Sequence, residues 1–151
     1  MTRAKTGLLQ GYVTHQSFKG LRIPANVQNL VMREYARNRD KTFRLSRGEY
    51  YFDGCFVQLY AMLRDLDQMD GIILCSLFML PQNPKKRREI FDMLLAAGGE
   101  MHCVFETLVV EDEAGVAELE DLYRLNDALD LAPQQIDRES LPPLNGIDTF
   151  T

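Results

Sequence analysis

The stretch Gly71-Ile72-Ile73-Leu74-Cys75-Ser76-Leu77 decides the fold of this chain. It is an almost continuous apolar run, and turn-forming or polar residues stand on both sides of it. Runs of this kind are typical of a strand that is buried on both faces of a parallel sheet. We therefore predict a central strand over residues 71–77.

Two strand–helix units precede this strand. Alternating and β-branched residues predict strands over 8–14 and 42–45, and apolar residues at helical spacing predict helices over 24–38 and after Asp53. In the first helix the residues that we expect on the apolar side are Val27, Leu30, Val31 and Tyr35.

A further helix and strand follow it. Asn83 before Pro84 is a typical helix start, and Gly98 ends that helix. A fourth strand covers 101–106, with 108–110 as its extension, and a last helix covers 113–129. Because strands alternate with helices, we predict right-handed crossovers and a three-layer α/β/α domain with a short, mostly parallel sheet of four to five strands.

Residues 1–130 form one domain in this interpretation, and residues 131–151 form a C-terminal tail. Pro133, Pro142, Pro143 and Gly146 prevent a continuous helix in the tail. Such a segment is either an arm packed on the body or on a partner subunit, or loose.

Composition excludes several classes of protein. The net charge of -5 opposes a nucleic-acid partner, which normally requires clustered Lys and Arg with a basic balance. No apolar stretch approaches the roughly 20 residues that cross a bilayer. The three cysteines are far apart in apolar runs, which predicts free thiols. We expect a cytoplasmic protein with no membrane contact.

Short motifs occur in order between about residues 10 and 125. They are Gly11-Tyr12-Val13, the segment 17–24 (SFKGLRIP), the segment 27–31 (VQNLV), Asp70-Gly71-Ile72, the segment 76–81 (SLFMLP), and the segment 102–106. This series resembles the sporadic carbohydrate cluster proteins, which are small bacterial proteins encoded among genes for surface carbohydrate synthesis. The resemblance implies a carbohydrate biosynthesis pathway and no particular reaction.

The layout is also similar to the catalytic domain of serine recombinases, which begins with a Gly-Tyr strand. That resemblance implies a resolvase-like fold, with a flavodoxin-like sheet as the alternative. Thr14 and Gln16 stand where that family has an arginine and the nucleophilic serine, and Phe78, Met79 and Gln82 stand where it has an aspartate and two arginines. DNA cleavage needs the serine and the cations around it, so we discard that function and keep the fold.

Ligands of parallel sheets bind at the carboxyl ends of the strands. The polar residues predicted there as substrate-binding are Ser17, Lys19, Arg22, Ser46, Tyr50 and Ser76. Ser17, Lys19 and Arg22 directly precede a helix N-terminus and can hold a phosphate there, although a solvated loop has the same composition. Tyr50 can stack on a sugar ring or base, or belong to the core.

Three residues are candidates for proton transfer. His15 follows the first strand and has an ordinary pKa near neutrality, but a surface histidine is the plainer interpretation. Glu49 and Glu106 follow other strands, where burial can raise a carboxyl pKa. Glu106 can instead satisfy a backbone N–H or pair with an arginine. His102 lies inside a strand, which favours a packing role, and we predict no metal and no cofactor.

Two functions follow from these residues. The first is binding of a phosphorylated or nucleotide-linked sugar at the strand ends, with isomerase, epimerase or lyase chemistry if a catalyst is present. The alternative is a non-catalytic interaction module for another enzyme of the pathway. A pocket where His15 meets Glu49 or Glu106 would favour the enzyme.

Homodimerisation is expected in either case. The cationic run Lys85 to Arg88 is by default a solvated surface and otherwise a contact for an anionic partner or a subunit.

Overall fold

A five-stranded sheet runs through the centre of the protein. The computed structural model describes residues 4–131, and the predicted tail over 131–151 lies outside them except for its first residue. The strand order is β2-β1-β3-β4-β5. All neighbours are parallel except β5, which is antiparallel to β4. The strands are β1 Leu8–Val13, β2 Thr42–Gly48, β3 Gly71–Leu74, β4 Glu100–Cys103 and β5 Leu108–Val110.

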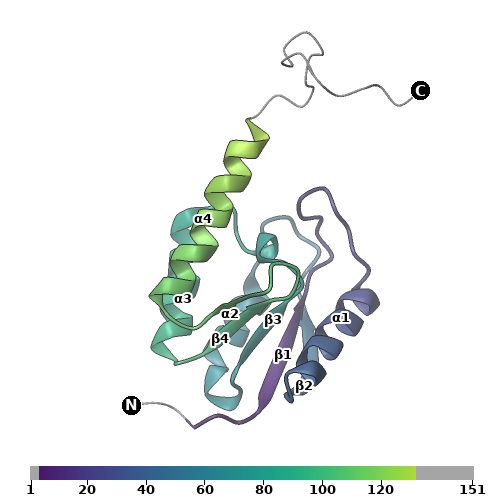
Figure 1. The fold of residues 1–151 in the computed structure, drawn as a ribbon. Helices are drawn as coiled ribbons and strands as arrows, with labels where there is room; N and C mark the ends of the chain where they lie inside the picture. The colour runs from purple at the N-terminus through teal and green to yellow at the C-terminus, as the bar shows by residue number, and fades with distance from the viewer. Residues whose placement is uncertain (1–3, 132–151) are drawn as a thin grey trace, which may run out of the picture.

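Helices cover both faces of this sheet, so the predicted three-layer α/β/α architecture is confirmed (Figure 1). Helix α1 (Ala25–Asn38) packs over β1 and β2. Helices α2 (Val57–Arg64) and α3 (Pro84–Ala96) pack against each other on the opposite face, as right-handed crossovers require. Helix α4 (Glu113–Asp130) packs along β5 and is joined to α3 by ion pairs.

Strand β3 is the buried centre of the sheet, and all four of its residues are buried. A Cβ on Gly71 would lie 2.1 Å from the carbonyl oxygen of Glu100, so only glycine fits where β3 meets β4. The strand is shorter than the predicted 71–77. Ser76 ends it by accepting a hydrogen bond from the Phe78 N–H, and that bond starts a short 3-10 helix, Leu77–Met79.

Helix α1 faces the sheet with a partly different side from the predicted one: Val31 and Tyr35 pack against the core as expected, but Val27 and Leu30 do not. Its buried residues are Gln28, Met32 and Ala36, whereas Val27 is exposed and Leu30 has an exposed fraction of 66%. The cause is Gln28, whose amide nitrogen donates to the carbonyl oxygens of Thr14 and Ile23 and whose amide oxygen accepts from the Thr14 N–H. Apolar periodicity does not detect this contact because glutamine counts as polar.

Two other boundaries differ from the sequence prediction. Residues 108–110 form the separate antiparallel strand β5 instead of extending β4, because a turn with Thr107 at φ +52° reverses the chain. Helix α2 begins only at Val57. The predicted start at Asn83 and Pro84 is confirmed, since the Asn83 side chain caps α3. No helix in the described part of the chain is long and apolar enough to span a membrane.

The cationic run at the start of α3 mainly holds two helices together. Arg87 is buried, forms a bidentate pair with Glu120 of α4 and donates to the carbonyl oxygens of Pro81 and Gln82. Arg88 pairs with Glu113 of α4. Lys85 and Lys86 are exposed. The opposing charges on α4 therefore offset the unfavourable position of these arginines at a helix N-terminus.

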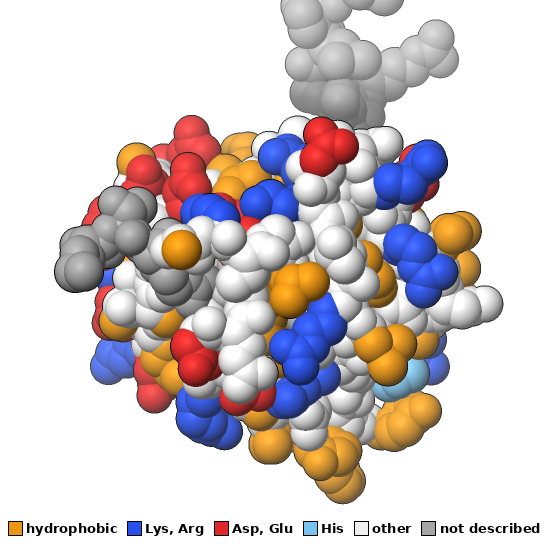
Figure 2. Space-filling model, turned by 90° about the horizontal axis from the view of Figure 1, so that it is seen from below, with side chains coloured by type: hydrophobic (Ala, Val, Ile, Leu, Met, Phe, Trp, Pro, Cys, Tyr) orange, Lys and Arg blue, Asp and Glu red, His pale blue; other side chains and the backbone are white. Residues whose placement is uncertain are grey.

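The amino-terminal edge of the sheet depends on Asp70, which directly precedes β3 and is fully buried. Its carboxylate accepts from the N–H groups of Thr6 and Gly7 at 2.6 and 2.9 Å and from Lys41 Nζ at 3.0 Å. Figure 2 views this end of the molecule, where the visible Lys and Arg side chains are scattered among acidic and hydrophobic ones. Burial alone would raise the pKa of Asp70, but these donors lower it to about 2.

We expect Asp70→Ala to lower the free energy of unfolding by about 3 kcal/mol, because it leaves buried donors without an acceptor. Urea unfolding measures this, with the exposed neighbour Asp67→Ala as the control. Since the pKa of Asp70 is lowered on folding, its stabilisation is complete above the unfolded pKa of 3.8 and is lost as the pH falls towards 2. Equal effects of the two substitutions would contradict this role.

Candidate functional site

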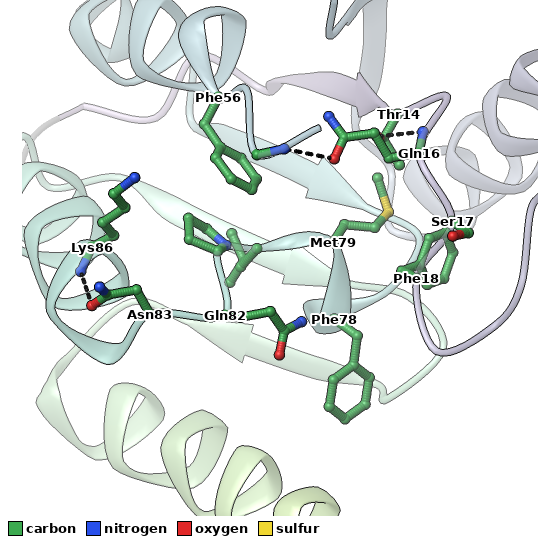
Figure 3. Close-up of a pocket in the computed structure, with 13 residues that line it drawn as sticks. Thr14, Gln16, Ser17, Phe18, Phe56, Phe78, Met79, Gln82, Asn83 and Lys86 are labelled. Atoms are coloured by element: carbon green, nitrogen blue, oxygen red, sulfur yellow. Dashed lines mark hydrogen bonds between the residues drawn. The ribbon is translucent and has the colours of Figure 1, made fainter. Parts of the chain in front are cut away.

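The carboxyl ends of β1 and β3 open into a cavity of 290 Å³, which we call the carboxyl-edge cavity. Its walls come from the loop after β1, the loop before α2, and the segment from the 3-10 helix to the first turn of α3. Figure 3 shows Lys86 on one side, the loop after β1 on the other, and Phe56 between them. The polar side chains of the lining are Thr14, Gln16, Ser17, Gln82, Asn83 and Lys86, and Phe18, Phe56 and Phe78 supply aromatic rings.

The loop after β1 is held in a tight hairpin at its tip. Phe18 and Leu21 exchange both backbone hydrogen bonds at 2.9 Å, and the two residues between them, Lys19 and Gly20, have φ of +52° and +73°. These angles are those of a two-residue hairpin turn in which glycine is favoured. The turn places the Lys19 ammonium 4.6 Å from the centroid of the Phe78 ring, at the rim of the cavity.

Gln16 connects two walls of the cavity. Its amide nitrogen donates to the Phe52 carbonyl oxygen at 2.7 Å, and its amide oxygen accepts from the Gly54 N–H at 3.4 Å. Its own backbone N–H donates to the Thr14 hydroxyl at 3.1 Å. The loops after β1 and β2 are therefore tied together at the mouth of the cavity.

The charged residue of the lining lies in the third wall, at the start of α3. Asn83 Oδ1 accepts from the backbone N–H groups of Lys85 and Lys86 at 2.8 and 3.4 Å, so α3 begins with its first amides satisfied. Among the residues that line the cavity, Lys86 is the charged one. An anionic group in the cavity would therefore meet the Lys86 ammonium, with Lys19 at the rim.

His15 and Arg22 lie in a separate groove with Tyr51, outside the carboxyl-edge cavity. The rings of His15 and Tyr51 are stacked, with centroids 4.6 Å apart. Ser17 lines the carboxyl-edge cavity and Lys19 lies at its rim. The predicted phosphate-binding set is thus divided between two hollows by the hairpin.

The predicted carboxylates act within the protein. Both oxygens of Glu49 accept from the Gln58 N–H in the first turn of α2, at 2.9 and 2.8 Å, and burial raises the pKa of this nearly inaccessible group. Glu106 accepts from the Leu77 N–H at 2.5 Å and is hydrogen-bonded to Ser76, and burial raises its pKa too. The structure does not bring either carboxylate together with His15, and catalysis by these residues stays a prediction.

The other predicted binding residues also have partners inside the molecule. Ser46 donates to the Asn29 side chain at 2.5 Å, and the Tyr50 hydroxyl accepts from the Gln58 side chain at 3.2 Å. Ser76 is buried beside Glu106. Their roles in substrate binding likewise remain predictions.

Residues that sequence analysis did not select line most of the cavity. Phe56, Gln82, Asn83 and Lys86 precede or begin helices, whereas the predicted binding residues follow strands. The sequence feature that could have indicated Lys86 is its place in the cationic run at a helix start, because Lys86 is the residue of that run that lines the cavity.

Comparison with known proteins relates the chain to recombinases by fold. A resolvase family site-specific recombinase from Streptococcus pneumoniae superposes with a TM-score of 0.61 at 14% identity, covering 82% of this chain and 90% of that one. The N-terminal catalytic domain of TP901-1 integrase gives 0.57 at 14% identity, covering 82% and 97%. Neither a protein-family model nor a curated protein matches the sequence. The predicted resolvase-like fold is confirmed, and the resemblance to carbohydrate cluster proteins has no support from these comparisons.

The carboxyl-edge cavity lies where the resemblance to serine recombinases places that family's reactive groups. Thr14, Gln16, Phe78, Met79 and Gln82 all line it, and each is uncharged. At these five positions the cavity lacks the serine nucleophile and the cations of phosphoryl transfer, while Ser17 and Lys86 line it from other positions.

We expect Glu49→Ala to lower the free energy of unfolding by about 1–3 kcal/mol, because it removes the acceptor of a partly buried N–H at the start of α2. Glu49→Gln keeps one acceptor oxygen and should cost less. Urea unfolding of both variants measures the difference. Unchanged stability in Glu49→Ala would contradict a structural role and return Glu49 to the list of catalytic candidates.

Proposed function

We propose that the protein binds a phosphorylated sugar in the carboxyl-edge cavity and holds it there without acid–base chemistry. The observation that carries this proposal is the lining, in which amide and hydroxyl groups stand beside one cation, the exposed Lys86. Amides donate and accept hydrogen bonds, as sugar hydroxyls do. A lysine ammonium is a common ligand for phosphate.

The size of the cavity favours a compact ligand. Pockets for small molecules usually measure about 300–1,000 Å³. At 290 Å³ the carboxyl-edge cavity stands at the lower end of that range. Of the two ligands predicted from the sequence, a monosaccharide phosphate suits it better than a nucleotide sugar.

The lining also supports binding over catalysis. It contains neither a histidine nor a carboxylate, which are the usual groups for proton transfer near neutral pH. Glu49 and Glu106 are already occupied by backbone N–H groups. We therefore place the protein in carbohydrate biosynthesis as a ligand-binding component, and its free cysteines favour the reducing cytoplasm.

Thermal unfolding with hexose 1-phosphates, nucleotide sugars, free hexoses and inorganic phosphate tests the proposal. A ligand at about 100 times its dissociation constant stabilises by roughly 2.7 kcal/mol and should raise the melting temperature by several degrees. Lys86→Ala should abolish the shift, whereas the exposed neighbour Lys85→Ala should keep it. Absence of a shift with every hexose phosphate, or equal loss in both variants, would reject the proposal.

A partner protein is the second candidate, favoured by aromatic residues exposed at the same edge. Tyr51 and Phe52 have exposed fractions of 78% and 73%. Exposed apolar clusters of this kind mark interaction surfaces.

The proposed homodimer has a different apolar contact available, because Leu125 and Leu129 are exposed on α4.

Light scattering after size exclusion tests the homodimer. A dimer through α4 should dissociate in Leu125→Lys/Leu129→Lys, because the substitution places cations in an apolar contact. The control is Tyr51→Ser/Phe52→Ser, which should leave the mass unchanged. A wild-type mass of one chain would rule the dimer out.

A further inference from the structure

Three side chains form a hydrogen-bonded chain between α1 and β4, on the sheet face that α1 covers. The Tyr35 hydroxyl lies 2.7 Å from His102 Nδ1, and His102 Nε2 lies 2.9 Å from Glu100 Oε2. His102 and Glu100 are buried, and Lys5 contacts the other oxygen of Glu100 at 2.5 Å. Tyr35 is half-buried and forms the outer end of the chain.

The direction of these hydrogen bonds follows from the acceptor at the inner end. A carboxylate only accepts, so His102 Nε2 carries the hydrogen and donates to Glu100. Nδ1 of the neutral ring is then an acceptor, and the Tyr35 hydroxyl donates to it. Hydroxyl, imidazole and carboxylate thus stand in the order by which a base activates a nucleophile and a third group orients that base.

The surroundings keep each group in the state that this order needs. Burial lowers the pKa of His102, although Glu100 opposes the effect, so the imidazole is neutral near pH 7 and its Nδ1 can accept from the Tyr35 hydroxyl. Burial raises the pKa of Tyr35, so its hydroxyl keeps its proton until a base removes it. The Arg39 guanidinium lies 4.5 Å from the Tyr35 ring centroid, where it can stabilise negative charge that develops nearby.

Tyr35 also lines an apolar groove of 450 Å³. The other lining residues are Leu30, Val31, Glu34, Asn38 and Val104. Leu30 is turned to this side because Gln28 takes the buried position on α1. The groove therefore offers an apolar wall for a hydrocarbon chain directly beside the Tyr35 ring.

We propose that Tyr35, His102 and Glu100 form a second reactive site, at which Tyr35 accepts the acyl group of an activated ester whose hydrocarbon chain lies in the α1 groove. Tyr35 is the nucleophile, His102 the general base and Glu100 the positioning residue. The site is separate from the carboxyl-edge cavity and does not depend on the function proposed for it.

The reaction forms one bond and breaks one. Tyr35 Oη attacks the carbonyl carbon of the ester, and its proton passes to His102 Nδ1. The bond from that carbon to the leaving oxygen breaks. The leaving group departs as an anion, which is a phenolate for a phenyl ester, or takes the proton from His102. The product is an acyl-tyrosine, and no oxidant, reductant or metal takes part.

Incubation with p-nitrophenyl butyrate tests this site, with p-nitrophenolate release and peptide mapping by mass spectrometry as readouts. We expect a butyryl group on Tyr35 in the wild-type protein. Tyr35→Phe should abolish it, and His102→Gln should slow it about 100-fold, the usual contribution of a general base. Tyr60→Phe is the matched control, because the Tyr60 hydroxyl bonds Glu89 with no imidazole between them.

Circular dichroism shows whether each variant folds. If His102→Gln does not fold, Glu100→Gln replaces it in the comparison of acylation rates. Slower acylation of Tyr35 in that variant supports the relay. Butyryl groups found only on lysines or on Cys55, or acylation of Tyr35 at an unchanged rate in the base variant, would overturn the proposal.

Discussion

The carboxylate of Asp70 is the contact on which the amino-terminal edge of the sheet depends. It accepts hydrogen bonds from the N–H groups that lead into β1 and from the lysine that precedes β2, while its own residue directly precedes β3. One buried anion therefore fixes the relative positions of three neighbouring parallel strands. Because those starts are fixed, the loops that follow the same strands emerge at defined places on the opposite edge.

Buried polar side chains organise that opposite edge in the same way. Gln28 donates to the Thr14 carbonyl oxygen directly after β1. Glu49 accepts from a backbone N–H in the first turn of α2, and Glu106 accepts from one in the segment after β3. Each satisfies backbone groups that helix and strand ends leave unpaired. Glu49 and Glu106 were predicted from the sequence as proton-transfer candidates, and the structure shows them in contacts that build the loops. What is left facing the cavity is amides, hydroxyls, aromatic rings and Lys86.

The sequence determines much of the fold and little of the site. The buried run at 71–74 and the cap at Asn83 depend on local residues, so both were predictable. The orientation of α1 depends on the polar Gln28 side chain bonding the backbone of Thr14 and Ile23, which apolar periodicity does not detect, and β5 depends on one turn at Thr107. The relay from Tyr35 to Glu100 joins segments 65 to 67 residues apart that only the sheet brings together.

The likeness to solved recombinase domains concerns the fold, and the carboxyl-edge cavity follows from that fold. The hollow is made by backbone: the ends of two parallel strands, a hairpin and a helix start. Side chains decide only what that hollow contacts. Thr14, Gln16 and Gln82 face this space with hydroxyl and amide groups, and Lys86 supplies its charge. The shape of this edge therefore follows from the backbone, and its capacity to hydrogen-bond a polar ligand follows from these side chains.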